Sequence, residues 1–97
     1  MKQYTSTEQT AKLIELGFEK PRLLYFGNKT IGDYAYTIGE LIEMLPKSYD
    51  SEGLSIEYHY MADVWIVRYP TKILIHKEEL VDALYEMAIK LKEEGVI

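Results

Sequence analysis

The chain has 97 residues, 47% of them hydrophobic and 28% charged, which is typical of a single globular domain covering residues 1–97. It contains no cysteine, which excludes disulfides and thiolate chemistry and fits a reducing compartment. The N-terminal residues lack the apolar core of a signal peptide, and no apolar run approaches the ~20 residues of a membrane span. We therefore expect a cytoplasmic protein that does not enter a membrane.

The net charge of −5 resides entirely in the second half of the chain. Residues 1–48 carry six basic and six acidic side chains, whereas residues 49–97 carry five basic and ten acidic ones. An acidic surface repels phosphate backbones, and no basic stripe compensates here. We expect no direct binding to nucleic acid. A minor alternative is that the acidic half mimics nucleic acid and occupies a basic groove of another protein.

The first predicted element is a helix over about residues 7–16. Thr5 or Ser6 can cap its N-terminus, and a Glu or Gln follows three residues later, which is the spacing of a capping box. Gly17 is placed to adopt the left-handed conformation that ends a helix, with Phe18 folding back over the last turn.

Two short strands and a second helix follow. Residues 22–26 and 34–36 are predicted to be strands on either side of a turn at 27–33. Thr37 then opens a helix of about two turns, and Glu40 completes a second capping box.

The run from Leu54 to Tyr69 predicts a β-hairpin, because apolar and polar residues alternate in it. We expect Tyr60 to pair with Trp65, so that the aromatic side chains face inward. The same register places Glu57 opposite Arg68 as a cross-strand ion pair. A four-residue loop suits the intervening residues better than a two-residue turn.

A short third strand is predicted at 72–75, and a long amphipathic helix at 77–94. The buried stripe of this helix should consist of Leu80, Val81, Leu84, Met87, Ala88 and Leu91. The sequence thus predicts an α+β fold of order α-β-β-α-β-β(-β)-α. In it, a small mostly antiparallel sheet of four or five strands packs against three helices, chiefly on one face.

The order of these elements resembles a group of small proteins that bacterial prophages and other mobile elements encode. The matching residues are Leu13 with Gly17-Phe18, Tyr34 to Leu45, Ile56 to Tyr69, and Glu78 to Ile97. The chain departs from the pattern at Glu43-Met44-Leu45, where the group usually carries a Trp. No activity is attached to the group, so the resemblance implies a phage or mobile-element context and a cytoplasmic location without implying a mechanism.

No motif predicts catalysis, a cofactor or a metal. Residues 27–30 only superficially resemble a phosphate loop, because Asn28 stands where a Gly must precede the Lys. Two histidines, His59 and His76, are too few for a zinc site. Carboxylate pairs such as Glu78-Glu79 fall at a predicted helix start or on solvent-exposed faces. We therefore expect a protein without enzymatic activity and without a cofactor.

Two surface patches are candidate contacts with a protein partner. The first is the second face of the hairpin, and the second flanks the buried stripe of the last helix. The residues concerned are His59, Met61, Val64 and Ile66 in the first patch, and Tyr85 and Ile89 in the second. Either patch would lose this role if the strand at 72–75 or the N-terminus covered it.

The leading hypothesis is a non-enzymatic protein-interaction or regulatory module, and the nine tyrosines of the chain support it. Self-association through a sheet edge, or through Tyr85 and Ile89, is one form of this hypothesis. The alternative is a small-ligand-binding or catalytic domain, with a pocket between the Tyr58/Tyr69 face of the sheet and the helices.

Overall fold

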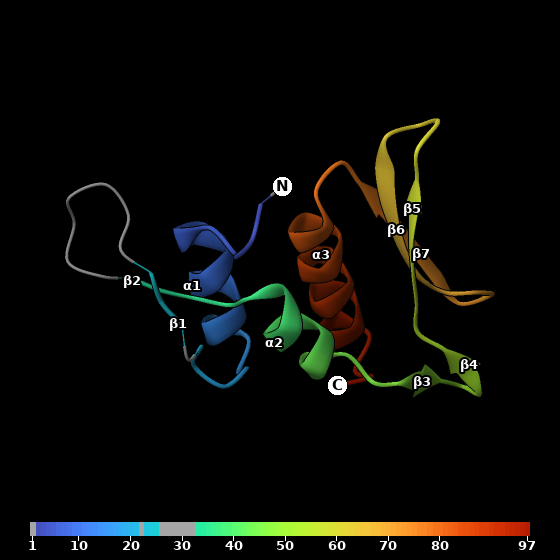
Figure 1. Cartoon of the computed structure of the whole chain (residues 1–97). Coiled ribbons are helices and arrows are strands. Elements are labelled where there is room, and N and C mark those ends of the chain that lie inside the picture. Colours follow the sequence, from blue (N-terminus) through green and yellow to red (C-terminus); the bar gives the residue numbers. More distant parts are fainter. Residues whose placement is uncertain (1, 22, 26–32) are drawn as a thin grey trace.

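Helices and short strands alternate along the chain and confirm the predicted α+β class (Figure 1). The computed structural model describes residues 2–21, 23–25 and 33–97, so residues 27–32 of the turn predicted at 27–33, with its Gly-Asn-Lys segment, lie outside the described residues. The helices are α1 (Thr7–Glu15), α2 (Ile38–Met44) and α3 (Leu80–Glu93). The strands are β1 (Leu23–Tyr25), β2 (Asp33–Ala35), β3 (Ser48–Tyr49), β4 (Glu52–Gly53), β5 (Ser55–His59), β6 (Val64–Tyr69) and β7 (Ile73–Lys77).

The described strands form three separate antiparallel sheets, which corrects the prediction of one sheet with four or five strands. β1 pairs with β2, β3 pairs with β4, and the third sheet has the order β5-β6-β7. The β3–β4 ribbon occupies what the sequence presented as a polar connector, and its turn places Asp50 and Ser51 at positive φ. Figure 1 shows the helices between the β1–β2 ribbon and the three-stranded sheet, so these strands have no opportunity to pair.

Capping boxes begin both short helices, as predicted. The Gln9 backbone N–H donates to Ser6 Oγ over 3.1 Å, and the Ser6 N–H donates to Gln9 Oε1 over 3.0 Å. Thr37 and Glu40 make the equivalent pair of bonds at α2, at 3.1 and 3.2 Å. Gly17 ends α1 at a φ of 98°, the left-handed conformation that glycine adopts without steric cost. Local signals thus determine both helix ends of α1.

Removing the α2 cap should measurably destabilise the protein. We expect Thr37→Ala to lower the free energy of unfolding by about 1 kcal/mol, because the Glu40 backbone N–H loses its acceptor in a helix of only seven residues. Urea denaturation measures this change. Thr7→Ala is the matched control, since Thr7 is exposed, and it should cost less than about 0.5 kcal/mol. Equal costs for the two variants would contradict the role of the cap.

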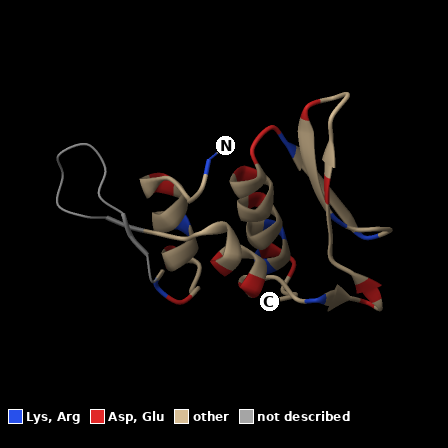
Figure 2. Ribbon diagram, in the orientation of Figure 1, with Lys and Arg blue, Asp and Glu red and all other residues tan. Residues whose placement is uncertain are grey.

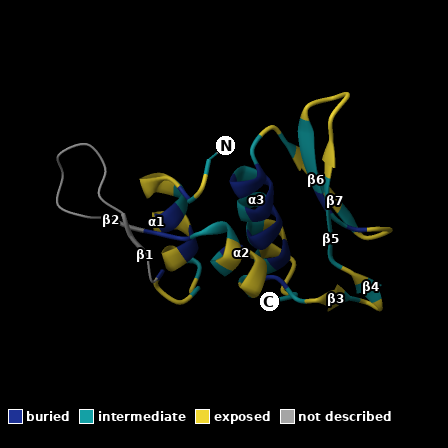
Figure 3. Ribbon diagram, in the orientation of Figure 1, coloured by how far each residue is buried: buried dark blue, intermediate teal, exposed yellow. Residues whose placement is uncertain are grey.

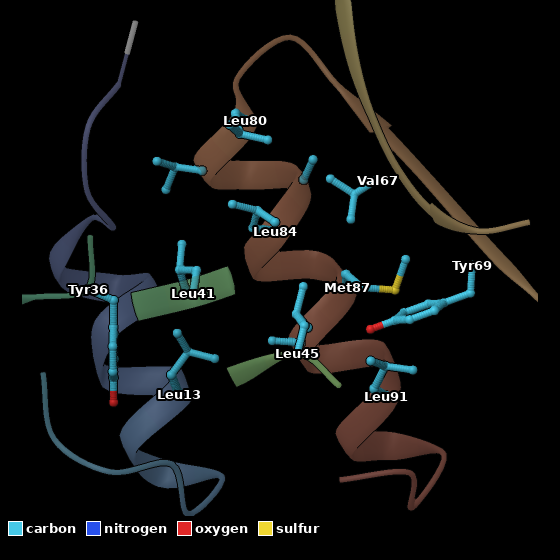
Figure 4. Packing of buried hydrophobic residues seen from close by; sticks show 13 residues of the cluster. Leu13, Tyr36, Leu41, Leu45, Val67, Tyr69, Leu80, Leu84, Met87 and Leu91 are labelled. Carbon is cyan, nitrogen blue, oxygen red and sulfur yellow. The ribbon is translucent and has the colours of Figure 1, made fainter. Parts of the chain in front are cut away.

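α3 is the centre of the hydrophobic core (Figure 4). Leu13, Leu41 and Leu45 lie on one side of it, and Val67 and Tyr69 from β6 lie on the other. The whole predicted stripe of α3 is buried, and Ala83 is buried with it. α3 therefore lies between the three-stranded sheet and the other helices, giving the order sheet, α3, then α2 with α1 (Figure 1).

The hairpin faces inward at Trp65 and Tyr69, as predicted, whereas Tyr58 and Tyr60, which were also predicted to face inward, are exposed. Val67 and Tyr69 are fully buried against α3, and Trp65 is half-buried against the same core. Ile56 of β5 and Ile75 of β7 pack on this side as well. We call this side the inner face of the sheet.

The predicted register of the hairpin is wrong by two residues. Tyr58, not Tyr60, lies opposite Trp65, and His59 lies opposite Val64. A shift of two residues keeps every side chain on its original face, so the alternation of apolar and polar residues cannot detect it. The four-residue loop is confirmed at residues 60–63, and Asp63 adopts a φ of 53° in it.

The Glu57–Arg68 ion pair survives this change of register. Arg68 Nη2 donates to Glu57 Oε1 over 2.7 Å, although Glu57 lies opposite Ile66 and is only a diagonal neighbour of Arg68. Both side chains are long enough to span the diagonal.

The boundary between the last strand and the last helix also differs from the prediction. The strand continues to Lys77, and the helix begins at Leu80 rather than at 77. The reason is tertiary: Lys77 pairs with Trp65 in the ladder with β6, which holds the chain extended. The carboxylate of Glu79 accepts a hydrogen bond from the Lys2 backbone N–H at 2.7 Å and does not cap the helix.

Candidate functional site

The sheet face turned away from α3 brings together three of the four residues predicted for the first patch. His59 lies opposite Val64 across the β5–β6 ladder, and Ile66 lies between Glu57 on β5 and His76 on β7. We call this side the outer face. Alternation along the strands assigns it the side chains of Ser55, Glu57, His59, Val64, Ile66, Arg68, Leu74 and His76.

A polar network crosses one part of the outer face and is centred on Glu57. Ser55 Oγ donates to Glu57 Oε1 over 3.0 Å, Arg68 Nη2 donates over 2.7 Å, and His59 Nε2 lies 3.3 Å from Oε2. The bonds from Ser55, His59 and Arg68 lower the pKa of Glu57. A carboxylate that is held ionised in this way is poorly suited to act as a general acid, which needs a raised pKa.

Among the side chains that the structure describes, the apolar ones most exposed to solvent lie at the end of the hairpin. We call residues 58–65 the hairpin tip. Tyr58, Tyr60 and Met61 are 46%, 79% and 87% exposed, and Figure 3 shows the loop in the colour of exposed residues. Met61 was predicted to lie opposite Val64, but it belongs to the loop, because the two-residue shift in register moves it out of the strand.

The hairpin tip is held in one shape by its own side chains. The Tyr58 hydroxyl donates to the Asp63 carboxylate, which raises the pKa of Tyr58. The rings of Tyr58 and Trp65 pack with centroids 5.1 Å apart at an angle of 49°. The positive φ of Asp63 and the hydrogen bond to its carboxylate therefore both constrain this residue. The loop exposes Tyr60 and Met61 to solvent. The sequence prediction omitted Tyr60, although it lies between two residues of the first patch.

The second predicted patch lines a groove between β7 and α3. Tyr85 and Ile89 are half-buried, as expected for residues that flank the stripe, and Ile73 and Ile75 of β7 lie across from them. The groove has a volume of about 750 Å³, and we call it the β7 groove. The sequence prediction found the helical side of this groove and missed its strand side.

The Tyr69 side of the pocket that the small-ligand alternative predicted is occupied by packed side chains. Tyr69 is fully buried, its hydroxyl donates to the Pro46 carbonyl over 2.6 Å, and its ring packs edge-on to Tyr49 at 5.8 Å. Four hollows lined by described residues, including the β7 groove, contain neither Tyr58 nor Tyr69.

A different hollow, of about 370 Å³, lies beside the start of α2. Phe18, Tyr36 and Met44 form its apolar wall, and Glu40 and Glu43 are at its rim. The Glu40 carboxylate is occupied in the capping box of α2, and the Tyr36 hydroxyl donates to the Glu19 carbonyl. The polar groups at this hollow are thus largely committed to the fold.

Ion pairs offset part of the acidic charge of the second half. Three carboxylates have a lysine Nζ within 2.8 Å, and Figure 2 shows basic and acidic segments interspersed around the sheet and α3. These pairs are Lys2–Asp82, Lys72–Asp50 and Lys77–Glu86. Because basic and acidic side chains are interspersed, the second half of the chain gives little support to mimicry of nucleic acid.

Within the described part of the chain, no three His, Cys, Asp or Glu side chains gather closely enough to hold a metal ion. Nor does any described helix combine the length and the apolar character needed to traverse a bilayer.

The geometry thus defines a small α+β domain in which, among the described side chains, the exposed tyrosines Tyr58 and Tyr60 lie on one projecting hairpin. Comparison with known proteins yields no matching family model, no matching curated protein and no matching solved structure. The function has to be inferred from the surfaces themselves.

Proposed function

We propose that the protein is a non-enzymatic interaction module that binds another protein through its hairpin tip. The observation that carries this proposal is the concentration of exposed apolar area in one short segment. Tyr58, Tyr60 and Met61 are exposed within four consecutive residues, whereas the other exposed large hydrophobic residues whose side chains the structure describes, Ile14, Ile42 and Leu74, lie singly on separate elements. Aromatic residues and methionine are the side chains most enriched in protein interfaces.

Burying the hairpin tip in a partner would be favourable, because it would remove apolar side chains from water. Removing a side chain such as that of Met61 from water contributes about 1.5–3 kcal/mol. The Tyr58–Asp63 bond and the Tyr58–Trp65 ring contact hold the loop before binding, so little further entropy is lost when it docks. Binding through the tip would therefore bury apolar surface, which is favourable, and would lose little conformational entropy.

The side chains of the tip indicate what kind of surface the partner should have. Tyr60 and Met61 are uncharged and project together, so they suit an apolar hollow on another protein. His59 and Glu57 lie beside them on the outer face and would meet the polar rim of that hollow. A regulatory or accessory role in a phage or mobile element remains a prediction from the resemblance.

The small-ligand alternative has weaker support. Its predicted pocket would lie against Tyr69, whose hydroxyl is bonded to Pro46 and whose ring is packed in the core. No observation favours a ligand there.

We expect the double variant Tyr60→Ser/Met61→Ser to lose its partner while keeping its fold. The wild-type chain is first used to capture binding proteins from the cells that naturally make it, and these proteins are identified. Each purified partner is then titrated against the wild-type chain and the variant by calorimetry. Loss of two central anchors should raise the Kd roughly 30-fold or more, which corresponds to about 2 kcal/mol.

Ile42→Ser is the matched control for this experiment. Ile42 is also an exposed large hydrophobic residue, but it lies on α2, away from the hairpin. Its Kd should stay within about twofold of the wild-type value. A double variant that binds every captured protein as tightly as the wild-type chain would refute the proposal.

A further inference from the structure

β7 leaves one edge of the three-stranded sheet open. It pairs with β6 on one side and has no strand partner on the other side among the described residues. An open edge presents unpaired backbone N–H and C=O groups, which proteins usually protect with charges, prolines or bulges. The first three residues of β7, Ile73-Leu74-Ile75, have none of these, and the charged Lys77 stands only at the end of the strand, whereas β5, the opposite edge, carries the charged Glu57 at its centre.

The β7 groove runs along this open edge and adds apolar side chains to it. Tyr85 and Ile89 of α3 and Ile73 and Ile75 of β7 are each half-buried there. The Lys77–Glu86 ion pair aligns the end of β7 with the first half of α3, which places Ile75 near the middle of the helix. A strand that joined β7 would thus bring its own supporting helix beside α3.

We propose that the occupant of this edge is a second copy of the chain, which adds its β7 antiparallel to β7 and forms a six-stranded sheet. The charges along the edge favour a copy over an unrelated strand. Lys72 and Glu78 are exposed and lie just beyond the two ends of β7, three residues on either side of Ile75, and Lys72 also pairs with Asp50 of its own chain. A twofold axis at Ile75 therefore places each Lys72 opposite the other copy's Glu78.

The helices show the same self-complementarity. Glu86 and Lys90 line the groove and lie two residues on either side of Ala88. Antiparallel α3 helices related by the same axis bring each Glu86, which also pairs with Lys77 of its own chain, towards the other copy's Lys90, and they place Tyr85 and Ile89 between the two helices. Strand pairing, apolar burial and charge pairing all follow from one symmetry axis.

This assembly does not depend on the hairpin tip, so the two proposals can fail separately. The wild-type chain should show a concentration-dependent monomer–dimer equilibrium in sedimentation velocity. Amide hydrogen exchange of residues 73–77 should slow as the dimer forms. Tyr60→Ser/Met61→Ser should leave this equilibrium unchanged.

Surface variants test the edge without disturbing the core. Leu74→Lys places a charge on the exposed side of β7, and Lys72→Glu sets two like-charge pairs across the axis; each should weaken the dimer about tenfold or more. The charge-exchanged variant Lys72→Glu/Glu78→Lys should restore the wild-type dissociation constant. A strict monomer, a dimer that both single variants leave intact, or a failure of the charge exchange to restore association would overturn the proposal.

Discussion

Replacing Met87 with alanine is expected to lower the free energy of unfolding by roughly 2–5 kcal/mol. Met87 is fully buried at the centre of α3, where the helix contacts the sheet on one side and the other helices on the opposite side (Figure 4). Truncation at this position leaves a cavity that neither layer can fill without moving the other. Because small domains have total stabilities of only about 5–15 kcal/mol, the variant should unfold at much lower urea concentration.

Met61→Ala is the matched control, since it makes the same chemical change in a side chain that is 87% exposed. Its free energy of unfolding should stay within about 0.5 kcal/mol of the wild-type value. Urea denaturation followed by the fluorescence of Trp65 compares the two variants directly. Similar losses in both would mean that α3 is not the centre of the core.

The helices were predictable because their signals are local. Ser6 with Gln9 and Thr37 with Glu40 lie three residues apart and satisfy each other's backbone groups without help from the rest of the fold. The stripe of α3 repeats with the helical period and was predicted residue by residue. The end of β7 was not predicted, because Lys77 is held extended by its pairing in the sheet with Trp65, which lies twelve residues earlier in the chain.

The hairpin shows where pattern alone stops being informative. Alternation determined which face is apolar, and so predicted that Trp65 and Tyr69 point inward. It did not determine the register, since a shift of two residues preserves both faces. The loop decided the register through the positive φ of Asp63 and the bond from Tyr58 to its carboxylate.

The same shift explains what the sequence missed in the candidate site. With the correct register, Met61 leaves the strand and joins Tyr60 at the tip, which turns part of a predicted flat patch into a projecting one. The open edge of β7 was also missed. It depends on which strands share a sheet, and the sequence contains no local signal for the division into three sheets.

The free energy of unfolding should fall by roughly 2 kcal/mol as the pH rises from about 10 to 12, because of Tyr69. Burial raises the pKa of Tyr69 from 10.0 to about 12, so the folded protein holds the hydroxyl proton more tightly than the unfolded chain does. The contribution is complete below pH 10, where both states are protonated. It is lost as the unfolded state begins to release the proton and is gone above the folded pKa.

Tyr69→Phe isolates this effect, because it removes the titrating hydroxyl and keeps the ring. At neutral pH the variant should lose about 1 kcal/mol, the contribution of the bond to the Pro46 carbonyl. Its unfolding free energy should then decline less steeply than that of the wild-type chain through the alkaline range, while lysine titration affects both proteins alike. Tyr60→Phe, at an exposed tyrosine, should reproduce the wild-type pH profile. If Tyr69→Phe also reproduces it, the Tyr69 hydroxyl reaches solvent in the folded protein, and the core between β6 and α3 is more open than the packing of Val67, Tyr69 and Met87 indicates.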